Sequence, residues 1–290
     1  MNGPALSSAS ETMPATRRSL PKGGRKILIG GSLAGSVVLF VALSWLIPGD
    51  PNAQVLSERL LPPALFGGTT GHLLGTDQLG RDMLLRLMHG GRIDLAIGLL
   101  AIVLSTLLGT VLGLLSAFYG KALDAIMSIL VAVQLALPTI LVVLLALSVL
   151  GPSVLTMGII LALSDWVLYG RTVRARALAE KAREYIEAAK VLGYRDSRIM
   201  FRHLLPNVTP SIMVLATMSL GQMILFQASL SFLGLGVQRP HPAWGRMVSE
   251  GQAYLSDGWW ISAFPGLLIG MVVLGLNVLG DGLRQVWKME

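Results

Sequence analysis

The chain has 290 residues, of which 53% are hydrophobic and only 13% are charged, and its formal net charge is +7. Soluble globular domains carry about 25% charged residues, so this composition excludes an ordinary soluble protein. Uncharged runs of about 20 residues recur, and each is long enough to cross a hydrocarbon core of roughly 30 Å. The sequence therefore predicts an integral membrane protein. It contains no cysteine, which excludes disulfides and thiolate metal sites.

The first 47 residues contain a polar stretch followed by an apolar one. Residues 1–26 are rich in Ser, Pro and Thr and end in a basic cluster, which predicts a disordered basic tail. Residues 27–47 follow without a single charge. A signal peptide has an apolar core of only about 7–15 residues, so the longer run favours a retained first transmembrane helix.

Residues 48–92 are a mixed segment that we expect to lie outside the cytoplasm. Thr76 or Asp77 is suited to cap a short amphipathic helix that runs to about Met88. Two carboxylates in this segment raise the alternative of a metal site, but nearby arginines favour ion pairs instead; the residues concerned are Asp77, Asp82, Arg81 and Arg86.

Five further apolar runs complete a prediction of six transmembrane helices, at residues 95–118, 125–150, 153–169, 208–233 and 259–279. Pro138 predicts a kink in the second of these five runs. Asp165 is the one acidic residue inside them. A carboxylate at mid-membrane costs about 2.5–3.5 kcal/mol on insertion scales. We therefore expect Asp165 to reach the interface or to pair with Arg171, with a proton relay as the alternative.

The polar stretch at residues 171–206 contains nine of the 23 Lys and Arg residues. At about 100° per residue, one helical stripe collects Ala182, Tyr185, Ile186, Ala189 and Leu192. Glu187 lies roughly opposite this stripe. Gly193 suits the left-handed position that ends a helix, and Pro206 is expected to end the next one. The pattern predicts a helix–turn–helix with one polar face free, and a solvated basic loop is the alternative.

The basic residues also predict the orientation. With six spans, the two termini, the turn at Lys121 and residues 171–206 share one side of the membrane. That side carries 17 Lys and Arg residues, and the other side carries six. The positive-inside rule therefore places both termini and residues 171–206 in the cytoplasm.

Motifs for chemistry are missing from the sequence. There is no GxxxxGK[ST] phosphate loop, no HExxH and no GxSxG, so we expect no enzyme, no cofactor and no metal. Gln134, Gln222 and Gln227 are the candidates to line a pathway through the membrane. The alternative, which the polar chemistry of membrane helices favours, is that these amides hydrogen-bond neighbouring helices.

Four sequence blocks resemble one family of transporters. They are Gly75-Thr76-Asp77 with Gly80-Arg81-Asp82, Glu187-Ala188-Ala189-x3-Gly193, Ser231-Phe232-Leu233-Gly234 with Trp244-Gly245, and Asn277 to Arg284. The chain resembles the C-type permease subunits of ABC importers for dipeptides, oligopeptides and nickel. Leu85 and Asp94 stand where that family usually has Ser, and His203 stands where many members have Ile.

The resemblance implies an all-α, type I importer permease in the inner membrane of a bacterium, with a five-helix core in residues 93–290. Expected partners are a second permease, two ATPases that hydrolyse ATP, and an extracytoplasmic binding protein. The residues implied in coupling to the ATPases are Glu184, Glu187, Ala188, Ala189, Gly193, His203 and Pro206. The substrate stays open among dipeptides, oligopeptides, glutathione, nickel chelates and opines. The alternative function is a secondary transporter or channel that works alone, which would need an ion site within its spans.

Overall fold

The computed structural model describes residues 22–287, and its regular structure is helical apart from one isolated bridge between Thr76 and Asp82. The α-helices are α1 (Lys22–Ala42), α2 (Met83–Tyr119), α3 (Lys121–Ala136), α4 (Thr139–Leu150), α5 (Val154–Lys181), α6 (Glu184–Val191), α7 (Asp196–Ile199), α8 (Leu205–Phe232), α9 (Trp244–Gly251) and α10 (Trp260–Val286). Five helical stretches are long and apolar enough to cross a membrane, and the bent pair α3 and α4 supplies a sixth span. The fold is therefore the expected six-span, all-α membrane protein.

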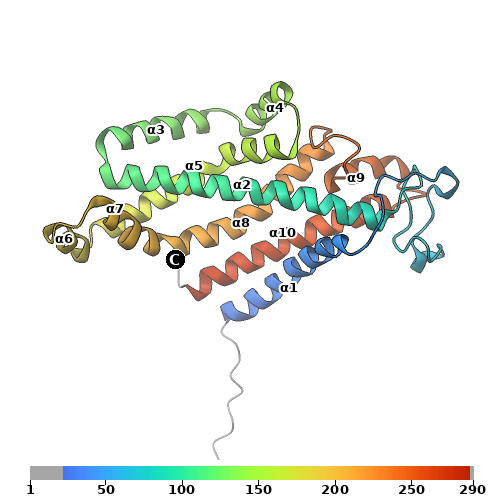
Figure 1. Cartoon of the computed structure of the whole chain (residues 1–290), viewed down its shortest axis with the longest axis horizontal. Helices are drawn as coiled ribbons and strands as arrows, with labels where there is room; N and C mark the ends of the chain where they lie inside the picture. The colour runs from blue at the N-terminus through green and yellow to red at the C-terminus, as the bar shows by residue number, and fades with distance from the viewer. Residues whose placement is uncertain (1–21, 288–290) are drawn as a thin grey trace, which may run out of the picture.

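The long helices run roughly parallel, and the connecting segments gather at the two ends (Figure 1). One end contains α6, α7, the start of α1, the end of α10 and the turn between α2 and α3. The other end contains α9 and residues 46–82. The tail predicted for residues 1–26 lies outside the described residues as far as residue 21, and α1 already begins at Lys22.

The second span begins earlier than expected and ends close to the expected residue, because α2 spans Met83–Tyr119 where the apolar run was residues 95–118. The cap of α2 is Asp82, whose Oδ1 accepts a hydrogen bond from the Leu85 amide at 3.0 Å, so the expected caps Thr76 and Asp77 are wrong. Asp77 is occupied elsewhere, because its carboxylate accepts the amides of Leu79 and Arg81. The short amphipathic helix expected before the membrane is thus the first part of a single 37-residue helix.

The helices α2 and α5 pack closely in the middle of the molecule. A Cβ added at Gly109 would lie 2.6 Å from the backbone oxygen of Trp166, and one added at Gly113 would lie 2.6 Å from that of Gly170. Small residues at such positions allow membrane helices to approach each other, which dispersion forces and close packing then stabilise. The helix α5 is thus held in the bundle by α2, and α3 and α4 lie against it.

The third span is broken rather than kinked. Leu137 and Pro138 both adopt extended conformations, and the axes of α3 and α4 meet at 88°. Proline disfavours helical geometry in the residue before it and cannot donate the next helical hydrogen bond. The effect of Pro138 is therefore stronger than the predicted kink. The break leaves open space between α3, α4 and α5.

The polar stretch between α5 and α8 is more helical than expected. The helix α5 continues past the predicted span to Lys181. After α7, a π-helical turn spans Met200–Leu204, in which the Leu205 amide donates to the Met200 oxygen. Pro206 then stands in the first turn of α8, where a missing N–H is tolerated, so the prediction that Pro206 ends the helix is wrong.

Candidate functional site

The polar hairpin formed by α6 and α7 is the first candidate site. Its turn is at Gly193, which has φ of +74°. The amides of Gly193 and Tyr194 donate to the oxygens of Lys190 and Ala189, the paired hydrogen bonds of a Schellman cap. The predicted helix–turn–helix geometry is thus present, with the glycine at the predicted position.

One face of the hairpin is buried and the other is free. Ile186 and Ala189 are buried in a cluster with residues of α2, α5 and α8. The predicted stripe is present only in part, because Ala182 ends α5 and Leu192 follows α6, and both residues are exposed together with Tyr185. Leu192 follows the end of α6, so its direction no longer obeys helical spacing. The exposed side chains of the hairpin are acidic, basic and apolar, and include Glu184, Glu187, Ala188, Lys190, Val191, Leu192, Arg195, Arg198 and Phe201.

His203 joins the two arms of the hairpin. Its ring centroid lies 6.2 Å from those of Tyr185 and Tyr194. Asn207 Nδ2 donates to the His203 backbone oxygen at 2.7 Å and to the Tyr185 hydroxyl at 3.0 Å. Partial desolvation of the exposed Tyr185, together with the hydrogen bond and the charge of Glu180, raises the pKa of this phenol to about 12, so it stays protonated and can donate to Glu180. The His203 ring therefore lies beside a tyrosine of α6 and the tyrosine that follows the turn.

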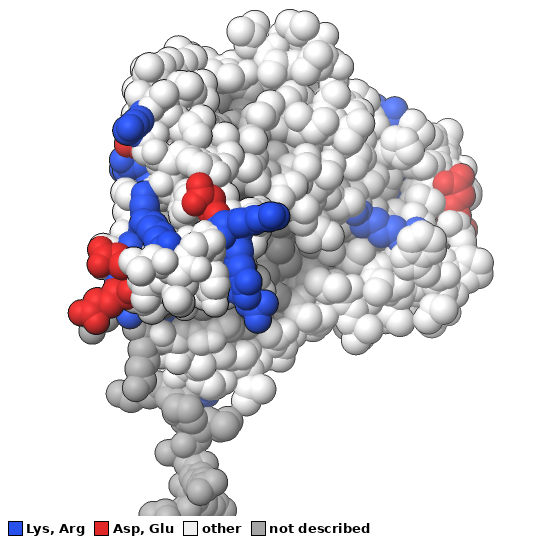
Figure 2. Space-filling view, turned by 60° about the vertical axis from the view of Figure 1, so that its left-hand side comes forward, with Lys and Arg blue, Asp and Glu red and all other residues white. Residues whose placement is uncertain are grey.

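Two polar contacts tie the hairpin end of α5 to the bundle. Lys181 Nζ donates to the backbone oxygens of Ala117 and Phe118 at the end of α2, where carbonyls have no helical partner. Arg174 binds Asp124 of α3 through Nε at 2.5 Å and Nη2 at 2.8 Å. These contacts hold the end of α5 against α2 and α3. Figure 2, in which the α6–α7 end comes forward, shows Lys and Arg side chains gathered on this end and beside a hollow.

A cavity of about 900 Å³ opens between the Pro138 break and α5. Its lining includes Gln134, Thr139, Ser164, Asp165, Arg171 and Thr172. Gln134 donates to the Ser164 oxygen at 2.7 Å and accepts from Trp166 Nε1 at 2.6 Å, so both ends of its amide hold α3 against α5. The expected pair between Asp165 and Arg171 is not formed within residues 22–287.

The other two candidate glutamines differ in exposure. Gln222 is exposed on α8. Gln227 is fully buried, and its Nε2 donates to Asp94 Oδ1 at 2.7 Å. The second oxygen of Asp94 accepts the Trp244 amide at 2.8 Å. Gln227 is thus a contact between α8 and α2 here. The sequence offered Asp94 only as a departure from a family pattern, and its contacts to α8 and α9 were not foreseen.

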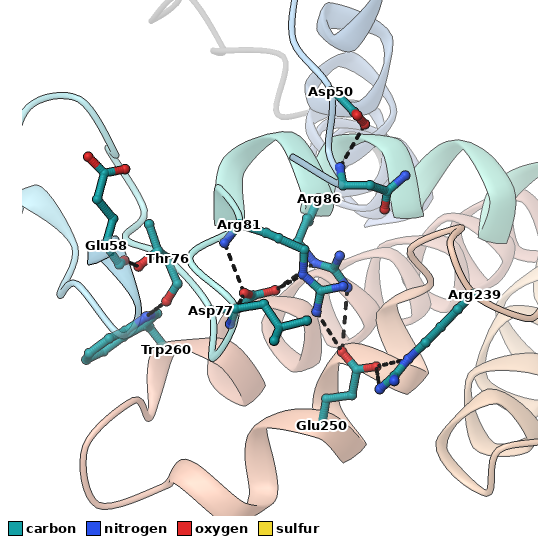
Figure 3. A network of polar contacts seen from close by, with 11 residues as sticks. Asp50, Glu58, Thr76, Asp77, Arg81, Arg86, Arg239, Glu250 and Trp260 are labelled. Carbon is teal, nitrogen blue, oxygen red and sulfur yellow. Dashed lines mark hydrogen bonds and ion pairs between the residues drawn. The ribbon is translucent and has the colours of Figure 1, made fainter. Parts of the chain in front are cut away.

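At the opposite end, an ion-pair cluster joins the start of α2 to α9 and its preceding loop (Figure 3). Asp77 pairs with Arg81 at 2.6 Å and Arg86 at 3.3 Å, as the sequence indicated. Glu250 bridges Arg81 at 3.4 Å and Arg239 at 2.7 Å. Burial alone would raise the pKa of Glu250, but the hydrogen bond from Arg239 and the charges of Arg86 and Arg81 hold it below its usual value. This cluster fixes the end of the bundle far from the hairpin.

Residues 109–287 match the model of a family described as binding-protein-dependent transport system inner membrane component. The chain is 40% identical over 260 residues to the di/tripeptide transport system permease DppC of Pseudomonas aeruginosa, covering 89% of this chain and 86% of that protein. It is 39% identical to the dipeptide permease DppC of Haemophilus influenzae, covering 88% and 89%. A chain of the solved inward-facing MetNI methionine ABC transporter superposes with a TM-score of 0.57 at 20% identity, covering 70% of this chain and 97% of that one.

Proposed function

Because the chain belongs to the family of binding-protein-dependent transport system inner membrane components, we propose that it forms half of the pathway through which an ATP-driven importer carries short peptides. As a member of this family it is a multi-pass permease subunit of a bacterial ABC transporter and not an enzyme. One observation supports the peptide substrate above all others: the 40% identity to a di/tripeptide permease extends over almost nine tenths of the chain.

The proposed partners are a second, different permease, two ATPase subunits and an extracytoplasmic binding protein. The second permease would cover apolar side chains of α3 and α4, many of which are exposed, among them Ile129, Leu135, Leu145 and Val149. The cavity beside these helices is lined by α3, α4 and α5 of this chain, and a pathway closed against lipid would need another protein over their exposed apolar side chains.

The proposed ATPase contact is the free face of the α6–α7 hairpin. Glu184, Glu187 and Ala188 are exposed on that face. Ala189 is buried beneath it, and Gly193 sets the turn that aims it. His203 and Pro206 do not belong to the exposed face itself. They would act indirectly, by shaping the second arm of the hairpin and its connection to α8. Closure of the ATPases would displace α6. The hydrogen bonds of Lys181 to α2 and the ion pair of Arg174 with Asp124 of α3 would then transmit this displacement to those helices.

The proposed orientation places the hairpin end in the cytoplasm. The 17 basic residues on that side against six on the other support this through the positive-inside rule. The start of α1 and the end of α10 lie at the hairpin end (Figure 1), so both would also be cytoplasmic. The end of the bundle that holds the largely buried ion-pair cluster of Asp77, Arg81, Arg86 and Glu250 would then be the end on the binding protein's side.

Reconstitution tests this function directly. The complex purified from native membranes is placed in liposomes that contain ATP and an ATP-regenerating system, with binding protein and radiolabelled Ala-Ala outside. Uptake that requires both ATP and the binding protein supports the proposal. Uptake driven by an ion gradient without ATP, from a chain that purifies alone, would instead establish a secondary transporter.

A further inference from the structure

Arg246 is a buried arginine of α9 whose guanidinium has no hydrogen-bond or ion-pair partner within residues 22–287. Only 8% of the residue is exposed. None of its nitrogens is among the fully enclosed atoms without a partner, which include Arg86 Nη1, so the guanidinium can still be reached from outside. Burying a cation without a compensating anion is unfavourable, so this arginine suggests a ligand that supplies the anion.

The carboxylates near Arg246 are already used by other arginines. Glu250, one helical turn further along α9, accepts Arg239 on Oε1 at 2.7 Å, and its Oε2 faces the two arginines that also pair with Asp77 (Figure 3). Two carboxylates are thus shared by four arginines, namely Arg81, Arg86, Arg239 and Arg246. Burial lowers the pKa of Arg246, and the charge of Glu250 offsets this only in part. The group as a whole has two more positive charges than negative ones.

Arg246 lines a pocket of about 450 Å³ between the end of α8 and α9. This volume lies within the range of about 300–1,000 Å³ that is typical of small-molecule sites. The polar residues of its lining are Ser231, Gln238, Arg239, Arg246, Ser249 and Glu250. Because two of them are cationic and only one is anionic, the pocket favours an anionic ligand.

The pocket lies on the side of the bundle where we place the pathway. The loop that carries Arg239 also carries Val237, which is buried in one cluster with Val143 and Leu147 of α4. The helix α4 is one of the two whose exposed apolar side chains the second permease would cover. At the end far from the hairpin, a peptide released by the binding protein would therefore meet this pocket before it enters the membrane.

We propose that Arg246 binds the terminal carboxylate of a peptide at the extracytoplasmic entrance of the pathway, with Arg239 as the second cation of the pocket. A guanidinium suits this group, because its paired N–H donors match the two oxygens of a carboxylate. The inference rests on the proposed peptide-transport function and assigns a recognition residue to the permease itself. Peptides whose carboxyl terminus is amidated would lose this contact.

The test measures binding to the purified complex without the binding protein, so that the recognition belongs to the permeases. Saturation-transfer NMR titrations compare Ala-Ala with Ala-Ala amide, which lacks the carboxylate. The variants are Arg246→Gln, Arg246→Lys and, as a matched control, Arg59→Gln, which removes an exposed arginine at the same end of the bundle. The wild-type complex should bind Ala-Ala roughly tenfold more tightly than its amide, as expected for one charge-assisted contact.

Arg246→Gln should remove most of that preference, Arg246→Lys should keep part of it, and Arg59→Gln should match the wild type. Because the buried charge of Arg246 is unpaired, Arg246→Gln should melt no lower than the wild type, which separates a ligand-binding role from a structural one. Equal affinities of the two peptides for the wild type, an unchanged preference in Arg246→Gln, a lower melting temperature of that variant, or no binding at all would overturn the inference.

A second titration, with the peptide-loaded binding protein, distinguishes the source of the carboxylate. The binding protein should dock on the wild type and on Arg246→Gln with equal affinity. Weaker docking on a variant that still prefers Ala-Ala over its amide would show that Arg246 receives an acidic side chain of the binding protein, and would overturn the inference. The liposome uptake assay decides the transport function separately: uptake without a binding preference refutes only the role of Arg246, and no uptake refutes the proposed function.

Discussion

Asp94 is a single buried side chain that connects three helices. From α2 it accepts Gln227 Nε2 of α8 and the backbone amide of Trp244, the first residue of α9. Trp244 in turn donates through Nε1 to the Leu87 oxygen. Both carboxylate oxygens are thus used, which offsets the cost of burying the charge.

Removing this carboxylate should destabilise the protein. Asp94→Ala strands two buried donors, and each buried group left without a partner costs about 1–3 kcal/mol. The melting temperature of the purified complex in detergent should fall clearly, and the added change Gln227→Leu should recover part of the loss. Asp281→Ala, at an exposed contact, is the control and should change the melting temperature little. An Asp94→Ala variant that melts like the wild type would contradict this account.

His72 lies between two carboxylates, with Nδ1 2.7 Å from Asp82 and Nε2 3.1 Å from Glu58. Burial alone would lower its pKa, but the two hydrogen-bonded carboxylates outweigh that effect and the pKa is raised above its usual value. A raised pKa means that the folded state holds the proton more tightly than the unfolded state. The resulting stabilisation is complete below the unfolded pKa of about 6.5 and is lost as pH rises through the folded pKa.

We therefore expect the segment around His72 to loosen as the medium becomes alkaline. Limited proteolysis of residues 48–82, measured between pH 5.5 and 8.5, should accelerate with rising pH in the wild type. His72→Gln cannot take up the proton, so its cleavage rate should change less over the same range after correction for the protease's own pH dependence. Parallel profiles for the two proteins would show that His72 does not stabilise this segment.

At the scale of elements, the turn between α6 and α7 depends on one backbone conformation. Gly193 has φ of +74°, and no atom lies within 4 Å of a Cβ added there, so space is available but the conformation disfavours side chains. Left-handed geometry costs roughly 1–2 kcal/mol for a residue with a Cβ. Gly193→Val should therefore shift the hairpin and lower ATP-driven uptake roughly tenfold, whereas Gly193→Asn should be tolerated better.

The control for this variant is Gly35→Val, which also meets no atom within 4 Å but lies in the regular helix α1. It should transport like the wild type. If Gly193→Val took up peptide at the wild-type rate and its ATP hydrolysis were unchanged, the turn would have no role in coupling.

The sequence predicted these elements unevenly. Apolar runs predicted every span, because the length of hydrocarbon to be crossed is fixed. The turn at Gly193 could also be predicted, because few other residues adopt its left-handed conformation. Proline was harder to interpret: Pro138 breaks a span that was expected only to kink, and Pro206 stands inside a helix that it was expected to end. The π-helical turn before Pro206 explains the second error, and no spacing in the sequence signals it.

The candidate sites were predicted less completely than the spans. The ion pairs of Asp77 could be predicted, because its arginine partners are close in the sequence. The contact of Glu250 with Arg81 could not, because the two residues are 169 positions apart and meet only in the folded chain. The same holds for Asp94 and Trp244, which are 150 residues apart. Asp165 was expected to pair with Arg171, but both face the same cavity without meeting. Long-range contacts of this kind depend on helix packing and not on local pattern.

At the scale of the whole molecule, the two ends of the bundle carry different polar structures. One end holds the hairpin with its exposed charged and apolar side chains, and the other holds the cluster of Arg81, Arg86, Arg239, Asp77 and Glu250 (Figures 1 and 3). The long helices connect them, and the cavity beside α5 lies between. An importer of this family needs such a division, because ATP is used on one side of the membrane and substrate arrives on the other.

Site-specific crosslinking of the hairpin tests the central claim most directly. The chain has no cysteine, so Glu187→Cys introduces a single thiol that can carry a photoactivatable group in native membranes. Leu73→Cys, exposed at the other end, is the control. Mass spectrometry should identify an ATPase subunit crosslinked to Cys at position 187, with a yield that changes on adding ATP, and none at position 73. A transport-active Glu187→Cys protein that never crosslinks to an ATPase would contradict the account.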